Sequence, residues 1–283
     1  MNLLRSITYS ATPILKKRAF TTTSCLRNEA ATERAERTMQ RFWKQAGVKE
    51  EKDGVTVVLD HRNLRTPSKN VIKLSTAQKH MALLTAAEWD AQTKVLKAHT
   101  LPLTSILSRA IDGLDVKTGG EEVEKDIRPA VIDKLLTYFD TDATCYYEDH
   151  PEVLVQLQDK YWKPILEWAT THYDVQINTT HDIFAVQQPQ ATKDKFRAVV
   201  EEMDSFELAA FERAVLTSKS FLIGLALVKH AISVEHAAQA AQVEINSQME
   251  RWGEVEDSHD VDREYMRKTL GSVAMAVMHK KNY

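Results

Sequence analysis

The residues that could support chemistry lie close together near the carboxyl end of the chain. Six acids fall within eleven residues there: Glu254, Glu256, Asp257, Asp260, Asp262 and Glu264. Glu256 and His259 have the spacing E-x-x-H, which is half of the signature of a di-iron carboxylate site. That chemistry needs a second E-x-x-H, and the chain has none. The cluster also lacks the glycine and the alternating aspartates of a calcium loop, so we expect no metal and no cofactor.

The common motifs of nucleotide binding and hydrolysis are absent as well. The eight glycines are never spaced as in a Walker loop or a G-x-G-x-x-G turn, and neither H-E-x-x-H nor G-x-S-x-G occurs. The ten histidines are scattered, and none is paired at i, i+4. These absences favour a protein that is not an enzyme. The alternative is an enzyme with an unfamiliar acid-based site around Glu256, His259 and Asp260.

The acidic cluster has two interpretations as a surface. Acids near the start of a final helix, predicted from about Ser258, are favoured by the helix dipole, so they indicate a solvated helix start. Glu254 and Glu256, however, directly follow Trp252 and Gly253, an aromatic residue beside a helix stop. That arrangement is typical of a partner-binding edge, and the residues alone leave both interpretations open.

Two further helices must position this cluster. The longest apolar run, Phe221 to Val228, lies in a helix predicted from Ser220 to Lys229 and is far shorter than the ~20 residues of a membrane span. An alanine-rich helix is predicted from Ser233 to Trp252, where Gly253 ends it.

Upstream, the residue patterns predict a small sheet followed by helices. Strands are expected over Gly54–Leu59, Leu64–Thr66 and Val71–Leu74. A covering helix is expected from Ser75 to about Lys97, with Met81, Leu84, Ala87, Ala91 and Val95 on its apolar face. Further helices are expected over Pro102–Leu114, Glu121–Tyr138 and Pro151–Tyr173, short strands at Thr144–Tyr147 and Val175–Ile177, and three or four long helices from Thr192 to the end. The predicted fold is therefore α+β and mostly helical, with a small β-containing domain (residues 38–99) and a multi-helical domain (residues 100–283).

The first 28 residues have the composition of a mitochondrial transit peptide. They carry five basic residues, many serines and threonines, and no acid. Without them the chain has 32 basic and 40 acidic residues, a net charge of about −8. So acidic a protein is not expected to bind nucleic acid or to insert into a membrane.

The motifs along the mature chain resemble those of one family, the mitochondrial assembly factor 2 of the F(1) sector of ATP synthase. Leu59 to Pro67 is close to the family's LDGR-x-x-RTP, and Trp252-Gly253-x-x-Glu256 matches its W-G-x-x-E. Between them stand Glu88-Trp89-Asp90-Ala91-Gln92, Pro102-Leu103-Thr104, Ala110-Ile111-Asp112, Asp140-Thr141-Asp142 with Cys145-Tyr146, Trp162-x-Pro164-Ile165-x-x-Trp168 and Ser220 to Leu227. Their order and spacing make the resemblance specific.

The resemblance implies a monomeric, non-enzymatic chaperone of the mitochondrial matrix. It implies binding to the free alpha subunit of F(1) ATP synthase, shielding of the surface that later meets the beta subunit, and release as the hexamer forms. The glutamate of the W-G-x-x-E motif, important in the family, maps onto Glu256. Asp257-Ser258 stand where the family often has Trp-Ala or Trp-Ser. The expected partner-binding residues are Trp252, Gly253, Glu254, Glu256, His259 and Asp260, and a scaffold for another inner-membrane complex is a further alternative.

Overall fold

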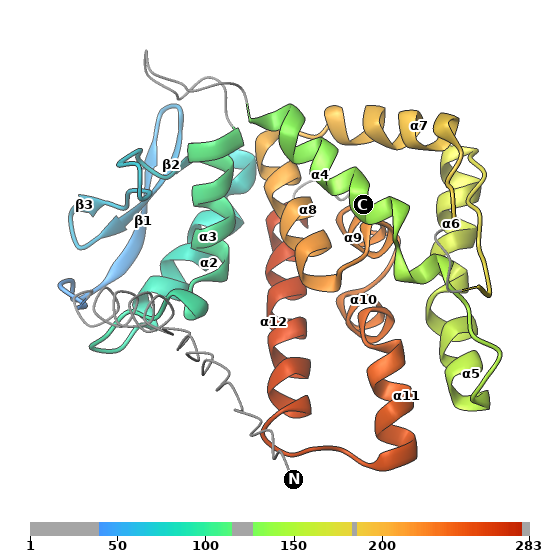
Figure 1. Cartoon of the computed structure of the whole chain (residues 1–283). Coiled ribbons are helices and arrows are strands. Elements are labelled where there is room, and N and C mark those ends of the chain that lie inside the picture. The colour runs from blue at the N-terminus through green and yellow to red at the C-terminus, as the bar shows by residue number, and fades with distance from the viewer. Residues whose placement is uncertain (1–39, 115–126, 183–185, 279–283) are drawn as a thin grey trace, which may run out of the picture.

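A computed structural model describes residues 40–114, 127–182 and 186–278 of the chain. A small antiparallel sheet forms one flank, two helices lie beside it, and the remaining helices gather beyond them (Figure 1). The predicted α+β, mostly helical fold is confirmed. Within the described ranges, no helix combines the length and apolarity needed to cross a membrane. Residues 1–28, Gly119-Gly120 and the first part of the helix predicted from Glu121 lie outside the described residues.

The sheet is built around its most apolar strand. Strand β2 (Gly54–Leu59), predicted from its β-branched residues, is almost wholly buried and pairs with every other strand. Its partner β1 (Ala46–Glu51) was not predicted, because the exposed half of that strand is polar. The predicted second and third strands are shorter and displaced, as β3 (Arg62–Asn63) and β4 (Lys73–Leu74).

The helix expected from Ser75 to Lys97 is shorter than predicted. A 3₁₀ turn, η1 (Thr76–Gln78), leads into α2 (Lys79–Asp90), and the chain then leaves the helical path. The predicted apolar face was also partly wrong, since Ala87 is exposed. The residues buried against the sheet are Met81, Ala82, Thr85, Ala86 and Trp89. Helix α2 ends early where the segment before β1 contacts it: Arg41 donates to the main-chain carbonyls of Asp90 and Gln92 at 2.7 and 2.6 Å.

The middle of the chain is helical as predicted, except that one predicted helix is divided near a proline. The predicted helix from Pro102 to Leu114 is α3 (Pro102–Arg109) continued by the π turn η3 (Ala110–Leu114), and α4 (Arg128–Asp140) follows. The helix expected from Pro151 to Tyr173 is two helices, α5 (Glu152–Tyr161) and α6 (Lys163–Tyr173), because Pro164 has no N–H for the preceding turn. The two predicted short strands were wrong: Thr144 and Cys145 lie in a 3₁₀ turn, η4 (Ala143–Cys145), and Val175–Ile177 forms no strand. A single bridge pairs Tyr146 with Thr180 instead.

Six helices, not three or four, make up the region from Thr192 to Val277, with α7 beginning two residues earlier. The helix predicted from Ser233 to Trp252 is divided at Gln242, which leaves the helical conformation at φ −120° and ψ 18°. The indole of Trp162 donates to the carbonyl of Ala240 beside this break, at 2.8 Å. The six are α7 (Gln190–Glu201), α8 (Ser205–Ser218), α9 (Phe221–Val228), α10 (Val234–Ala241), α11 (Val243–Trp252) and α12 (His259–Val277).

The apolar helix α9 lies at the centre of the helical part, as its sequence predicts. All eight of its residues are buried, and it packs against α4, α6, α8, α10 and α12. Helix α12 in turn contacts α3, α8, α9 and α10. One continuous apolar core runs from Trp43 in the first described segment to Val277 at the end of α12. Helices α11 and α12 both extend beyond this core toward one end of the molecule (Figure 1).

Candidate functional site

The candidate site is the projecting end of α11 and α12 with the segment that joins them, residues 253–258; we call it the α11–α12 tip. Helix α11 ends at Trp252 because Gly253 adopts φ 89°, a conformation that L residues rarely adopt. Asp257 is also in the left-handed region, at φ 62°. The main chain therefore turns twice within six residues before α12 begins at His259, and Figure 1 shows this segment linking the two helix ends.

Three of the predicted partner-binding residues shape the tip. The N–H of Val255 donates to Nδ1 of His259 at 3.1 Å, and the N–H of His259 donates back to the carbonyl of Val255 at 3.2 Å. Glu254 forms an ion pair with Arg263 at 3.2 Å. With the glycine turn at Gly253, these contacts fix the path of the joining segment. Asp260 accepts only from the adjacent N–H of Val261, at 2.8 Å.

Two predicted residues are left free to meet a partner. Trp252 is 72% exposed, and only the guanidinium of Arg251, 4.8 Å from its ring centroid, contacts it face-on. Glu256 is exposed and has no hydrogen-bond or ion-pair partner among the described residues. The structure thus gathers all six predicted residues at one tip but divides them into residues that shape it and residues that project from it.

The tip also carries apolar residues that the sequence analysis missed. Val255 is 60% exposed, Val261 58% and Tyr265 44%. Of the ten exposed large hydrophobic side chains among the described residues, six lie on α11, α12 or the joining segment: Ile245, Trp252, Val255, Val261, Tyr265 and, near the far end of α12, Met275. The i, i+4 spacing of Val261 and Tyr265 in an otherwise polar turn was the available signal.

A groove runs from the tip toward the core. It has a volume of about 560 Å³ and lies between the end of α8, the α10–α11 break and the first turns of α12. Tyr265 and Ile245 line it, as do the acids Glu244 and Asp262. The phenol of Tyr265 accepts a long hydrogen bond from Arg213 at 3.4 Å. Arg213 and Lys219 line the groove as well, so its acids and bases balance, and the groove joins exposed apolar surface to polar surface of both signs.

The geometry gives no support to acid-based or metal chemistry at this tip. Glu256 lies outside α12, in the turn before it, so Glu256 and His259 do not share a helix face as an E-x-x-H metal motif requires. In the part of the chain that the structure describes, no group of three or more possible ligand side chains is placed to hold a metal ion. The arrangement is suited to contact with another molecule.

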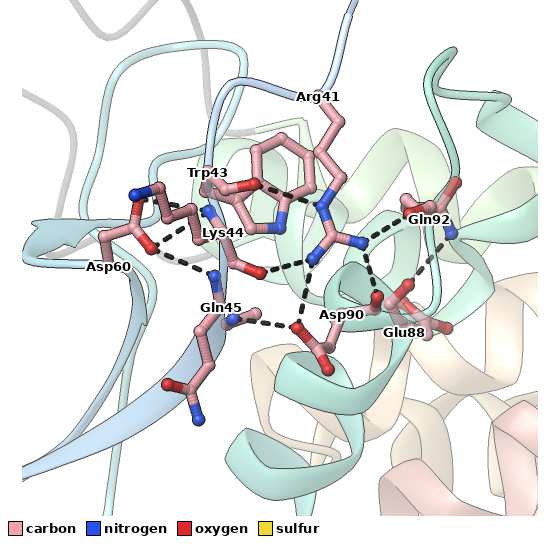
Figure 2. A network of polar contacts seen from close by, with 9 residues as sticks. Arg41, Trp43, Lys44, Gln45, Asp60, Glu88, Asp90 and Gln92 are labelled. Carbon is pink, nitrogen blue, oxygen red and sulfur yellow. Dashed lines mark hydrogen bonds and ion pairs between the residues drawn. The ribbon is translucent and has the colours of Figure 1, made fainter.

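Carboxylates in the other motifs, by contrast, are used by the fold. Glu88 caps α3: its carboxylate accepts from the N–H of Leu103 at 2.7 Å and of Thr104 at 3.0 Å. Burial raises the pKa of Glu88 while these donors oppose the rise. Asp90 accepts from the N–H of Ala46 at 3.1 Å, within the network that Arg41 organises at the end of α2 (Figure 2).

The same structural use extends to two other motifs. Asp112 accepts from the hydroxyl of Thr66 at 2.6 Å and from the side-chain amide of Asn70 at 2.9 Å, which ties η3 to the loop after β3. Asp142 is fully buried and accepts from the hydroxyl of Ser220 at 2.7 Å and from the N–H of Leu222 at 2.9 Å, at the start of α9. These motif acids are therefore structural, whereas Glu256 is free.

Comparisons with known proteins identify the family of the chain. Residues 40–170 match the family model described as ATP12 chaperone protein. The chain is 32% identical to the mitochondrial atp12 protein of Schizosaccharomyces pombe, over 83% of this chain and 81% of that one. It is 28% identical to mitochondrial ATP12 of Saccharomyces cerevisiae, over 90% and 89%.

A solved structure shares the fold. The crystal structure of Atp12 from Paracoccus denitrificans has a TM-score of 0.71 and 30% identity, and it covers 87% of this chain and 100% of its own. These relatives are named as chaperones or as Atp12 proteins, and the two yeast proteins are mitochondrial. The match to a relative above 30% identity, along most of both chains, shows that this mitochondrial protein belongs to the ATP12 chaperone family.

Proposed function

We propose that this chaperone of ATP synthase assembly binds the free alpha subunit of the F(1) sector in the mitochondrial matrix. In this proposal it shields the surface of that subunit that later meets the beta subunit, and it is released as the hexamer forms. Its contact surface is the α11–α12 tip. The single observation that carries this assignment is the set of exposed apolar side chains between Trp252 and Tyr265, beside the acids Glu256 and Asp257, which have no partner among the described residues.

The apolar part of the tip matches the need of a subunit awaiting assembly. A free subunit exposes an apolar interface, and such patches aggregate unless they are covered. Trp252 is large, rigid and 72% exposed, and tryptophan is enriched among the residues that carry most of the binding energy in interfaces. Val255 and Val261 flank it in the same tip with 60% and 58% exposure.

The acidic part determines which surface the tip accepts. Glu256 has no partner among the described residues, and Asp257 beside it is exposed. Acids that lie around an apolar contact favour a basic rim on the partner and repel acidic surfaces. Because exposed charges are screened beyond a Debye length of ~8 Å at physiological ionic strength, we expect the complex to weaken as salt is raised.

The test is a charge reversal at the unpaired acid. We expect Glu256→Lys to leave the melting temperature nearly unchanged, because the side chain makes no contact that the fold uses. We expect the same variant to lose capture of the purified alpha subunit and to fail to support F(1) assembly in a strain that lacks the native protein. Glu167→Lys is the matched control, since Glu167 is an exposed acid on α6 without a partner among the described residues.

The outcomes separate a contact residue from a structural one. A large fall in melting temperature for Glu256→Lys would show that Glu256 holds the tip in shape. Full capture of the alpha subunit by this variant would remove the tip from the proposed interface. Capture of a different inner-membrane complex subunit by the wild-type chain, with no alpha subunit, would favour the scaffold alternative.

A further inference from the structure

Strand β3 and the segment just after it carry two arginines, Arg62 and Arg65, whose charges meet no carboxylate among the described residues. The aspartate of the preceding turn is structural: Asp60 accepts from the N–H of Lys44 at 3.0 Å and of Gln45 at 2.9 Å, as Figure 2 shows. Arg62 is exposed and has no partner among the described residues. Arg65 donates only to the main-chain carbonyl of Lys69, at 2.9 Å, so its charge meets no carboxylate in the described part of the chain.

These arginines border a hollow of about 740 Å³ on the sheet flank. Its apolar floor comes from Leu59, Leu64 and Trp89, all nearly buried. Among the described residues, no acidic side chain lines it. Lys49 also borders it but already shares Glu51 with Lys73, at 3.4 and 3.5 Å, so the two guanidiniums are the uncompensated charges.

An aromatic side chain stands beside these charges. Phe42 lines the same hollow and is 65% exposed, although its neighbour Trp43 is buried. The two rings meet edge to face, with centroids 5.1 Å apart. Because the Arg41 network and the β1–β2 pairing fix the main chain here, Phe42 is held at the surface of the described part of the chain. A fixed aromatic ring beside free guanidiniums is typical of a protein-binding surface.

From this juxtaposition we infer that the hollow is a second docking site, which receives an acidic segment of the client carrying an apolar side chain. Guanidiniums bind carboxylates in bidentate geometry, and the floor beside Phe42 accepts the apolar side chain. The inference rests on the proposed function for the identity of the client. The sheet flank and the α11–α12 tip lie in different parts of the molecule (Figure 1) and have opposite charge, so two contacts would fix the orientation of one bound subunit.

The first experiment measures the affinity of the full chain for purified alpha subunit. We expect the double variant Arg62→Glu with Arg65→Glu to raise Kd by about tenfold or more, because both attractive pairs become repulsive. We expect Phe42→Ala to raise Kd severalfold. The matched control reverses Lys52 and Lys134 to Glu; both are exposed lysines that lie outside the hollow, and the change in net charge is the same. All variants should keep the wild-type melting temperature.

The salt dependence gives a second reading of the same site. The plot of log Kd against log salt should be less steep for the arginine variant than for wild type and for the lysine control. Wild-type affinity in the arginine variant, with loss of binding in Glu256→Lys, would overturn the sheet site and leave the proposed function intact. Equal weakening by the arginine variant and the lysine control would also overturn it, since net charge alone would then explain the effect.

The second experiment does not depend on the alpha subunit. A labelled peptide with four acidic residues around one phenylalanine should bind the wild-type chain and should bind the arginine variant at least several-fold more weakly. If wild type fails to bind the alpha subunit but this peptide result holds, the proposed function fails and the acidic-segment site stands. Vesicles with anionic lipid and a short duplex DNA are tested in the same way. If either binds the wild-type chain more tightly than the peptide does, and the arginine variant loses that binding, a protein segment is not the occupant of the hollow.

Discussion

Asp142 offers the sharpest test of how the helical part is held together. Its side chain is fully buried between η4 (Ala143–Cys145) and the start of α9. Four donors from two segments reach it: the N–H and hydroxyl of Thr144 at 3.1 and 2.9 Å, the hydroxyl of Ser220 at 2.7 Å and the N–H of Leu222 at 2.9 Å. Burial raises the pKa of Asp142, and these donors oppose the rise. The carboxylate therefore couples α9 to the chain that follows α4.

The cost of removing the carboxylate follows from the donors it leaves behind. Asp142→Ala leaves two main-chain N–H groups without an acceptor, and each buried unsatisfied group costs about 1–3 kcal/mol. The variant no longer has to bury a charged carboxylate, and this gain offsets part of the cost of the unsatisfied donors. We therefore expect a net loss of ~3 kcal/mol in the free energy of unfolding. For a chain of this size ~1 kcal/mol shifts the melting temperature by about 2–4 °C, which gives a fall of about 6–12 °C.

A double-mutant cycle with Ser220→Ala tests whether the two residues act as one unit. Ser220 also caps α9 by accepting from the N–H of Ile223 at 3.0 Å, and loss of such a cap costs ~1 kcal/mol. Because its hydroxyl donates to Asp142, the double variant should be less destabilised than the sum of the single ones, by ~1 kcal/mol. Urea unfolding followed by circular dichroism measures all four proteins. A change below ~0.5 kcal/mol for Asp142→Ala, or strict additivity, would refute this account.

Two further predictions concern helix packing and a surface ion pair. A Cβ at Gly224 would lie 2.8 Å from Cγ2 of Val215 and 3.2 Å from its N, whereas one at Gly271 in α12 would meet nothing within 4 Å. Gly224→Ala should therefore lower the free energy of unfolding by ~1–2 kcal/mol, because overpacking outweighs the helix propensity of alanine. Gly271→Ala should raise the free energy of unfolding by ~0.5–1 kcal/mol. If thermal melts show that both variants change stability in the same direction, the close α8–α9 contact is contradicted. The side-chain hydrogen bonds of Arg267, at 2.8 Å, lower the pKa of Glu235 to about 2. A lowered pKa means that the pair stabilises the fold above pH 4.5 and that this contribution, under ~1 kcal/mol for an exposed pair, is lost as the pH falls toward 2. In an NMR titration, Arg267→Gln should return the pKa of Glu235 toward its ordinary value, and an unchanged titration would exclude the ion pair as the cause.

How far the sequence predicts this fold depends on whether an element is determined locally. Helix α9 has its cap, Ser220, and an unbroken apolar run within ten residues, so its bounds were predicted closely. Arg41 bonds to the carbonyl at the end of α2, and the indole of Trp162 bonds to a carbonyl at the α10–α11 break; both partners are distant in sequence. No local pattern contains those partners, so α2 was predicted too long and α10 and α11 were predicted as one helix.

The same reasoning explains what the sequence showed of the sites. The motifs that carry the family resemblance look alike as strings of residues, and only the contacts divide them into two kinds. Glu88, Asp112 and Asp142 supply acceptors that the fold requires, so their presence needs no partner. Trp252, Glu256 and Arg62 stand within equally distinctive motifs but contribute little or nothing to the fold's contacts. A motif residue without structural use is the residue to test for binding. On that criterion the α11–α12 tip and the hollow beside Arg62 and Arg65 are separate surfaces, and the two charge reversals should lower client affinity without lowering the melting temperature.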